Sequence, residues 1–92
     1  MAISHEFTAY ANENLTLSCK PRDSPSHLVF WYKTDRNSKD AEKFLHTGPT
    51  FTIINASVTD TGIYSCSAVE WGTWSIKSYI MVNVIGGLFV FN

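Results

Sequence analysis

The chain has 92 residues, of which 45% are hydrophobic and 16% are charged, and its formal net charge is −1 at pH 7. This size and apolar content allow one domain with one core and leave no room for a second. A charge so close to zero excludes a basic surface for nucleic acid or for an anionic membrane. Because no apolar run approaches the ~20 residues of a spanning helix, we expect no direct membrane insertion of this segment.

The first half of the chain predicts short strands separated by polar turns. Residues 3–10 are expected to form a first edge strand, and residues 15–20 alternate apolar and polar side chains as a half-buried strand does. A loop that contains Pro21 and Pro25 then leads into a central strand at residues 28–33.

The second half predicts a corner between two strands, followed by a hairpin. A short strand is expected at residues 43–46. Beyond it we expect strands at residues 50–54 and 62–69 on either side of the corner, a hairpin tip at residues 70–74 and a return strand at residues 75–84.

The corner carries the most specific pattern, Asp60-Thr61-Gly62-Ile63-Tyr64-Ser65-Cys66. Aspartate can hydrogen-bond its own backbone and glycine tolerates the positive φ of such turns, so Asp60 and Gly62 are expected to shape it. Tyr64 and Cys66 are two residues apart and therefore point to the same side of the next strand. Upstream, Cys19 ends an alternating segment, and Trp31 follows twelve residues later.

This Cys–Trp–Cys order, with a tyrosine two residues before the second cysteine, resembles the immunoglobulin superfamily over nearly the whole chain. The resemblance implies an all-β fold: a Greek-key sandwich of two antiparallel sheets with seven or eight strands. Only nineteen residues separate Trp31 from Phe51, which favours the shorter I- or C2-like sets over a variable domain. The resemblance also assigns Trp31, Tyr64, Asp60 and Gly62 to the core.

The two cysteines have two possible states. Cys19 and Cys66 are 47 positions apart and could be free buried thiols, because unpaired cysteine is often a core residue. The resemblance implies instead that they form one disulfide between the sheets. A disulfide would place the chain in an oxidising, extracellular compartment.

Two narrower likenesses appear within the superfamily. Residues 52–56 and 60–66, followed by residues 78–82, look like the first ectodomain of split-kinase-type receptor tyrosine kinases. The same stretch, with residues 13–19 and 87–90, is also similar to Fc-receptor domains. In both families the last strand runs almost directly into the next domain.

The expected domain boundaries follow from this likeness. Residues 1–85 are assigned to the immunoglobulin-like domain, and residues 86–92 to a C-terminal extension or the start of a following domain. The apolar run Leu88–Phe91 needs cover, which a neighbouring domain would provide, although a strand folded back on this domain would also provide it. The first residues lack the features of a signal peptide, so Met1 is interpreted as an expression start on a fragment of a longer secreted precursor.

Aromatic residues near the hairpin predict a protein-binding surface. Tryptophan is frequent in binding hot spots, and burial of both Trp71 and Trp74 at a hairpin tip is hard to arrange. The alternative is that one of them caps the end of the sheet. Alternation predicts that further apolar side chains lie on the outward face of the adjacent strands, where they would form an interface or only pack laterally. The predicted partner-binding residues are Trp71, Trp74, Phe30, Tyr32, Tyr79 and Met81.

Two tripeptides fit the acceptor pattern for N-linked glycans. Asn14-Leu15-Thr16 and Asn55-Ala56-Ser57 both match Asn-x-Ser/Thr, and Asn55 is expected to be exposed because it follows a strand. A tripeptide this short also arises by chance. Together with a disulfide, however, the pair favours a glycosylated ectodomain.

No pattern in the sequence predicts catalysis or a bound cofactor. No nucleophile elbow is recognisable, and His5, His27 and His46 share no metal-ligand spacing. We therefore expect a non-enzymatic, extracellular recognition module of a cell-surface receptor or adhesion protein, membrane-anchored or secreted. It would bind a protein ligand or counter-receptor and contact neighbouring domains of its own chain. The alternative is a structural spacer in a multidomain array with no ligand of its own.

Overall fold

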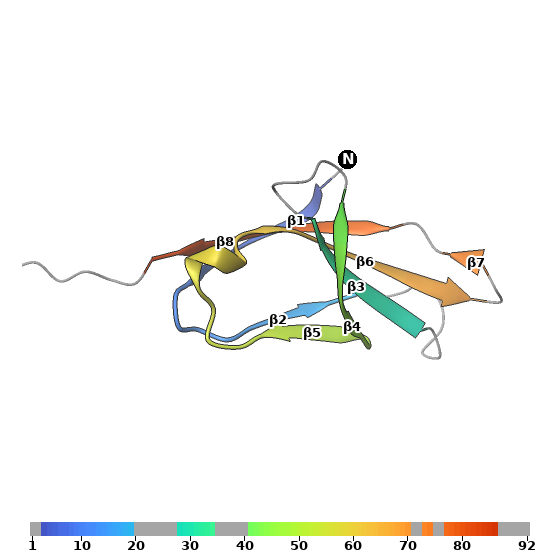
Figure 1. Cartoon of the computed structure of the whole chain (residues 1–92), viewed down its shortest axis with the longest axis horizontal. Coiled ribbons are helices and arrows are strands. Elements are labelled where there is room, and N and C mark those ends of the chain that lie inside the picture. Colours follow the sequence, from blue (N-terminus) through green and yellow to red (C-terminus); the bar gives the residue numbers. More distant parts are fainter. Residues whose placement is uncertain (1–2, 20–27, 35–40, 71–72, 75–76, 87–92) are drawn as a thin grey trace, which may run out of the picture.

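The computed structural model describes residues 3–19, 28–34, 41–70, 73–74 and 77–86, and these residues form two packed β-sheets (Figure 1). The elements are β1 (Ile3–Tyr10), β2 (Leu15–Ser18), β3 (Leu28–Thr34), β4 (Glu42–Thr47), β5 (Thr50–Ile53), the 3₁₀ helix η1 (Val58–Asp60), β6 (Gly62–Glu70), β7 (Thr73–Trp74) and β8 (Ser78–Ile85). The predicted all-β sandwich with seven or eight strands is confirmed, with eight strands in the described residues. The short strand expected at residues 43–46 is present as β4.

The two sheets differ in size. The large sheet has the strand order β1-β8-β6-β3-β4, with β7 paired to β6, and the small sheet consists of β2 and β5. The chain crosses between the sheets four times: from β1 to β2, from β2 to β3, from β4 to β5 and from β5 to β6 (Figure 1). The small sheet therefore covers the inner face of the large sheet with only two described strands.

One strand pair departs from the expected antiparallel arrangement. β1 runs parallel to β8, with Phe7 opposite Val82 and Ala9 opposite Val84. The cause is the early crossing to the small sheet: β1 and β2 do not form a hairpin, so β1 is free to lie along the last strand. Directly after β1, the amide of Ala11 donates a 2.8 Å hydrogen bond to the carbonyl of Ile85.

The core consists of the inward-facing side chains of both sheets. Alternate positions of β3 and β8 are buried, whereas β6 is buried on both faces from Tyr64 to Ala68. The inward-facing side chains of these strands meet apolar residues of β2 and β5. Each fully buried side chain of this kind contributes roughly 1.5–3 kcal/mol. The buried hydrophobic cluster is Leu17, Val29, Trp31, Ile53, Ala56, Tyr64, Cys66, Ala68, Ile80, Val82 and Val84.

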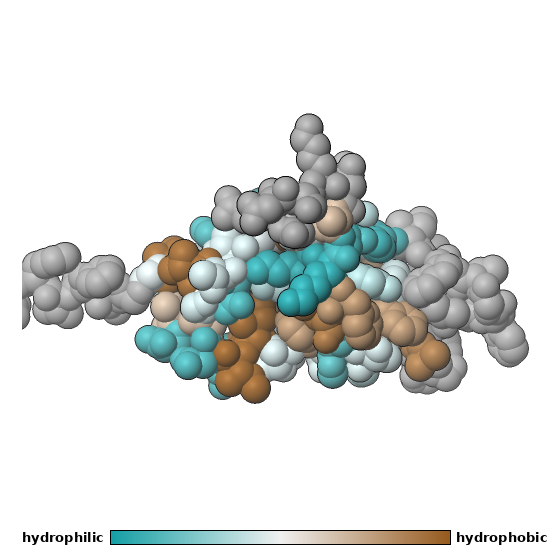
Figure 2. Space-filling model, viewed as in Figure 1, coloured by the Kyte–Doolittle hydropathy of each residue, from teal (hydrophilic) through white to brown (hydrophobic). Residues whose placement is uncertain are grey.

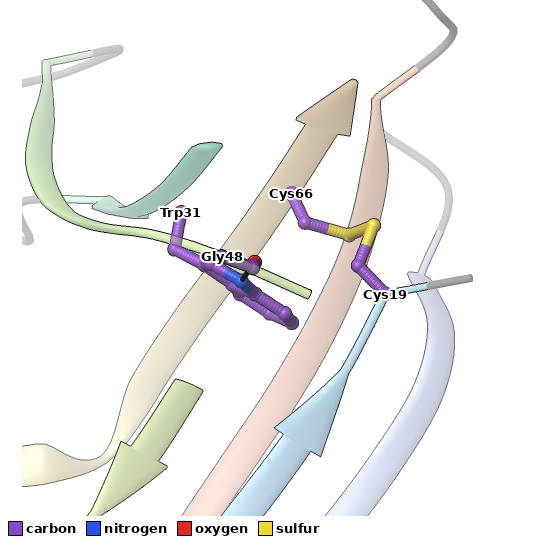
Figure 3. Close-up of a disulfide and its surroundings, with 4 residues drawn as sticks. All are labelled: Cys19, Trp31, Gly48 and Cys66. Atoms are coloured by element: carbon purple, nitrogen blue, oxygen red, sulfur yellow. Dashed lines mark hydrogen bonds between the residues drawn. A yellow bond between two sulfur atoms is a disulfide. The ribbon is translucent and has the colours of Figure 1, made fainter. Parts of the chain in front are cut away.

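A disulfide joins the two sheets and confirms the predicted pairing of the cysteines. Cys19 follows β2 and Cys66 lies in β6, and their Cα atoms are 6.2 Å apart. Trp31 is opposite Cys66 in the β3–β6 pairing and is fully buried. Figure 3 shows its indole beside the disulfide, with the ring nitrogen directed at the carbonyl of Gly48. The indole and the disulfide together fill the centre of the sandwich.

The corner before β6 is held by hydrogen bonds around Asp60. The amide of Ser57 donates to Asp60 Oδ2 at 2.8 Å, which closes the single turn of η1. The hydroxyl of Tyr64 donates to the carbonyl of Asp60 at 2.6 Å. Burial of the phenol, followed by the nearby charge of Asp60, raises the pKa of Tyr64 to about 12. The corner thus satisfies a hydroxyl that the core would otherwise leave without a partner.

Two expectations about this corner need correction. Asp60 is only partly buried, so it belongs to the turn rather than to the core. Gly62 does not supply a positive φ, because among the described glycines only Gly48 has one, at 149°. Gly62 is buried, and a Cβ added there would lie 3.0 Å from Lys33 Cε. The glycine therefore leaves room for the Lys33 side chain, which would have to shift by a few tenths of an ångström to admit a methyl group.

The expected extent of several segments also changes. β2 ends at Ser18 and β8 begins at Ser78, whereas longer strands were expected at residues 15–20 and 75–84. The proposed boundary at residue 85 coincides with the last residue of β8. The apolar run Leu88–Phe91 lies outside the described residues, so its assignment to this domain or to a following one remains a prediction.

Candidate functional site

The outer face of the large sheet carries a row of side chains that crosses four strands. Strand register aligns Phe44 of β4 with Tyr32 of β3, Tyr32 with Ser65 of β6, and Ser65 with Tyr79 of β8. Their neighbours along the strands, such as Trp31 and Ile80, are buried on the opposite face. We call the outer side of these strands, with Phe30 and Met81, the aromatic face.

Three aromatic rings are in contact on this face. The ring centroids of Tyr32 and Phe44 are 5.8 Å apart in an edge-on arrangement, and those of Phe30 and Phe44 are 6.3 Å apart. Such geometries are favourable for aromatic pairs. Phe44 is nevertheless 52% exposed, whereas Phe30 and Tyr32 are each partly buried. The cluster is therefore prepacked but still presents a large apolar side chain to solvent.

A charged pair lies across the centre of the aromatic face. Lys77 forms a salt bridge with Glu42 Oε1, and the hydroxyl of Ser65 donates to Glu42 Oε2 at 2.8 Å. The ammonium of Lys77 also lies 4.9 Å from the centroid of the Tyr32 ring, within range of a cation–π contact. This pair connects β4 to the start of β8 over the two strands between them.

The surroundings of this pair favour its charged state. Burial alone would raise the pKa of Glu42, but the hydrogen bonds from Lys77 and Ser65 and the charge of Lys77 outweigh it and lower that pKa. The hydrogen bond to Glu42 raises the pKa of Lys77 against the opposing effect of burial. Both groups stay ionised near neutral pH, so they neutralise each other and leave an aromatic face without net charge at its centre.

The structure places the predicted binding residues in two groups. Phe30, Tyr32, Tyr79 and Met81 lie on the aromatic face, and each is partly buried. Trp71 lies outside the described residues. Trp74 belongs to β7 and pairs with Val69 of β6, but its side chain lies outside the described part of the structure. A role for the hairpin tip therefore remains a prediction.

Phe44 and the Glu42–Lys77 pair are missing from the sequence-based set. The pairing of β3 with β4 is irregular between Trp31 and Tyr32, so that Trp31 is opposite His46 while Tyr32 is opposite Phe44. Alternation counted along the chain therefore does not show that Phe44 lies on the outer face beside Tyr32. The available signal was the segment Glu42-Lys43-Phe44, with an aromatic residue in a predicted strand beside charged residues.

The small sheet presents a different outer face. Its outward side chains all carry hydroxyl groups and are exposed: Thr16, Ser18, Thr50 and Thr52. The hydroxyls of Thr16 and Thr52 are 3.0 Å apart across the two strands. Both predicted glycan acceptors, Asn14 and Asn55, are exposed at one end of this sheet. The molecule thus has one aromatic and one hydroxyl-lined side.

The described residues contain no group of three or more His, Cys, Asp or Glu side chains that could hold a metal ion. Within the same ranges, no helix has the length and hydropathy of a membrane span.

Two packed sheets, a central disulfide against a buried tryptophan, and a tyrosine bonded to its own corner define an immunoglobulin-like sandwich. A profile described as immunoglobulin domain matches residues 3–69. The chain belongs to the immunoglobulin domain family. The narrower likenesses to receptor tyrosine kinases and Fc receptors remain predictions.

Relatives with similar sequences are long proteins compared with this chain. It is 32% identical over 84 residues to hemicentin-1 of Mus musculus, which covers 89% of the chain and 2% of the relative. It is also 32% identical over 77 residues to contactin-5 of Danio rerio, covering 82% and 7%. The zwei Ig domain protein zig-1 of Caenorhabditis elegans is 32% identical over 88 residues, covering 88% and 33%. The chain therefore spans a third or less of each of these relatives.

Solved structures agree on the fold. The N-terminal four Ig domains of Dscam1 isoform 4.44 match with a TM-score of 0.77 at 17% identity, over 95% of this chain and 24% of that one. The N-terminal eight Ig domains of Down Syndrome Cell Adhesion Molecule isoform 1.30.30 match with a TM-score of 0.75 at 18% identity, over 87% and 11%. At these identities the likeness concerns the fold alone.

Proposed function

We propose that this domain is a non-enzymatic, extracellular recognition module of a cell-surface receptor or adhesion protein. It binds a protein partner through the aromatic face, with the β6–β7 hairpin tip and its tryptophans Trp71 and Trp74 at the edge of the contact. The observation that carries this proposal is Phe44, which packs on Phe30 and Tyr32 and is still 52% exposed.

The energetics of the aromatic face support binding. Complete burial of an exposed phenylalanine contributes roughly 1.5–3 kcal/mol, and aromatic side chains dominate binding hot spots. Because Phe44 is already held by two other rings, little side-chain freedom remains to be lost on binding. The neutralised Glu42–Lys77 pair adds polar groups that fix the orientation of a partner without repelling it.

The family relationship supports the setting of the proposal. The sequence relatives include hemicentin-1 and contactin-5, and a structure of the same fold is named a cell adhesion molecule. The disulfide Cys19–Cys66 is typical of proteins in oxidising, extracellular compartments. The partners of those whole proteins are only candidate partners of this chain, because the chain matches a small part of each relative.

The proposal can be tested with a multimeric form of the chain and a panel of purified ectodomains that includes the chain itself. Each protein that binds is measured again with Phe44→Ser, Tyr32→Ser and Tyr79→Ser. We expect each substitution to weaken binding by at least tenfold, which corresponds to about 1.4 kcal/mol. Ile54→Ser is the matched control, because Ile54 is 73% exposed but lies beyond the small sheet. Binding that is lost only with the control would overturn the proposal.

The spacer alternative has support of its own. The chain matches 2% of hemicentin-1 and 7% of contactin-5, as one unit among many in a long protein would. A spacer needs no aromatic contact surface. Phe44→Ser would therefore change neither the contacts of a spacer with its neighbouring domains nor its stability. If no member of the panel binds while the folded domain still resists unfolding, the spacer function is favoured.

A further inference from the structure

Two acceptor asparagines that are far apart in the sequence lie next to each other. Asn14 precedes β2 and Asn55 follows β5, and the antiparallel pairing of Leu15 with Ile53 brings these ends together. The backbone amide of Asn55 donates a 2.8 Å hydrogen bond to the side-chain oxygen Oδ1 of Asn14. Both side chains are exposed, and each begins an Asn-x-Ser/Thr tripeptide, with Thr16 and Ser57 as the third residues.

We propose that Asn14 and Asn55 both carry N-linked glycans, and that this pair of glycans covers the end of the small sheet with the adjoining side chains of Ile54 and Val58 and leaves the aromatic face open. This inference rests on the extracellular setting of the proposed function, since only a secreted chain meets the glycosylation machinery. It goes further by assigning opposite roles to the two outer faces of the sandwich.

The modification is compatible with the hydrogen bond between the two residues. Glycan transfer breaks one N–H bond of the side-chain nitrogen Nδ2 and forms a bond from that nitrogen to the anomeric carbon of the sugar. The donor is a lipid-diphosphate-linked oligosaccharide, whose diphosphate is the leaving group and departs as the nitrogen's proton is lost. Asn14 Oδ1 is unchanged in this reaction and continues to accept the hydrogen bond from the backbone amide of Asn55. Asn14 can therefore act as a structural acceptor and as a glycan attachment site at the same time.

The local backbone directs Asn55 away from the sheet. Its φ is 54°, in the left-handed region that asparagine adopts more readily than most residues. The next residue, Ala56, is buried, and its amide donates to the carbonyl of Glu13 at 2.8 Å. The Asn55 side chain thus leaves from a fixed, solvent-facing turn.

The surface around the two asparagines suits carbohydrate better than a protein partner. The outer face of the small sheet offers only threonine and serine hydroxyls, with no aromatic side chain among its outward positions. Two apolar side chains next to Asn55 are nonetheless exposed, Ile54 by 73% and Val58 by 55%. Figure 2 shows hydrophobic surface at this end of the molecule. A glycan on Asn55 would shield these side chains from water and from other proteins.

The position of the pair separates it from the predicted binding surface. Figure 1 shows the start of β2 and the end of β5 near the end of β8, at the opposite end of the sandwich from the β6–β7 hairpin. The loop before Asn14 is joined to both neighbours, because Ala11 donates to Ile85 and Asn12 donates to Ala56. Glycans here would not obstruct the hairpin or the aromatic face.

Occupancy is tested by secreting the whole chain from eukaryotic cells behind a heterologous signal peptide and mapping glycopeptides by mass spectrometry. We expect one glycan at each asparagine. Thr16→Val should remove the glycan of Asn14 and Ser57→Ala that of Asn55, while the asparagines themselves are retained. Asn14→Asp is the structural control, because it keeps an oxygen acceptor for the Asn55 amide but has no Nδ2. Secreted chain with an unmodified Asn14 or Asn55 would overturn the inference.

Coverage is tested separately by hydroxyl-radical footprinting before and after the glycans are trimmed to a single sugar. Labelling of Ile54 and Val58 should rise severalfold after trimming, whereas labelling of Phe44 should not change. Equal labelling of Ile54 in the two samples would refute shielding. Neither result depends on a protein partner, so a failure here is distinct from a failure of the proposed binding function.

Discussion

The indole nitrogen of Trp31 donates a 2.8 Å hydrogen bond to the carbonyl of Gly48, 17 residues further along the chain. The amide of the same glycine donates to the carbonyl of Val29 at 2.8 Å. Both the amide and the carbonyl of Gly48 are thus hydrogen-bonded to residues of β3. Gly48 lies in the connection between β4 of the large sheet and β5 of the small one. Trp31 therefore fills the core and also determines where the chain changes sheets.

Replacement of Trp31 should be strongly destabilising. Trp31→Ala removes the largest fully buried side chain of the described residues, and we expect a loss of roughly 3–5 kcal/mol in the free energy of unfolding. Trp31→Phe should cost less, because it keeps an aromatic ring but leaves the Gly48 carbonyl without its donor. Urea denaturation of the oxidised protein measures both. A loss below about 1 kcal/mol for the alanine variant would mean that the ring does not support the core.

Tyr64 should make the protein sensitive to alkaline pH. Its pKa is about 12 in the fold against 10 for the ordinary side chain, so the folded state holds the phenol proton more tightly. The stability linked to this proton is fully present below pH 10 and is lost as the pH rises towards 12, by about 3 kcal/mol in total. Tyr64→Phe should remove this part of the alkaline loss, at a cost of about 1–2 kcal/mol at neutral pH. Tyr10→Phe, at an exposed position, should leave the alkaline loss in place.

Gly62 and Gly86 should respond differently to the same substitution. An alanine Cβ at Gly62 would meet Lys33 Cε at 3.0 Å and disturb the lysine, whose Nζ donates to the carbonyl of Thr59 at 3.0 Å. At Gly86 the nearest atom is Val58 Cγ2 at 3.9 Å, an ordinary contact. We expect Gly62→Ala to be less stable than Gly86→Ala by about 1 kcal/mol in thermal unfolding. In a Lys33→Ala background the difference should shrink, and an unchanged difference would exclude Lys33 as its cause.

The Glu42–Lys77 pair should stabilise the aromatic face in a pH-dependent way. The pKa of Glu42 is lowered in the fold, so its contribution is present above the ordinary pKa of 4.5 and is lost as the pH falls through the folded-state value. Glu42→Gln should reduce the acid-induced loss of stability, and Lys77→Met should do the same by removing the partner. At neutral pH each change should cost only about 0.5–1 kcal/mol, because the pair is partly exposed. Identical acid titrations of the three proteins would contradict this role.

The tryptophans of the hairpin should affect binding more than folding. Trp71→Ala combined with Trp74→Ala is expected to keep the free energy of unfolding within about 1 kcal/mol, the usual scale for surface positions. The same double variant should weaken the binding of any partner that the panel identifies as binding through the aromatic face. Unchanged affinity would remove the hairpin tip from the contact and leave the aromatic face alone as the binding surface.

The positions of the strands and the core tryptophan were accessible from the sequence because each leaves a local pattern, and the disulfide followed from the family resemblance that these patterns support. Alternation locates β2, β3 and β6, and the corner motif identifies Tyr64 and Cys66. The parallel pairing of β1 with β8 leaves no such pattern, since alternation is the same in either direction. Phe44 was missed because an irregularity in the β3–β4 pairing changes which residues face outward. The contact between Asn14 and Asn55 depends on strand register, which joins residues 41 positions apart.

The parallel alignment of β1 and β8 has a mechanical consequence. The start of β1 and the end of β8 lie at opposite ends of the ladder, so tension applied between them pulls the two strands past each other along their length. All the hydrogen bonds of the ladder then share the load and must break together, whereas a hairpin pulled from its adjoining ends opens one bond after another. The domain is therefore built to resist stretching along the chain.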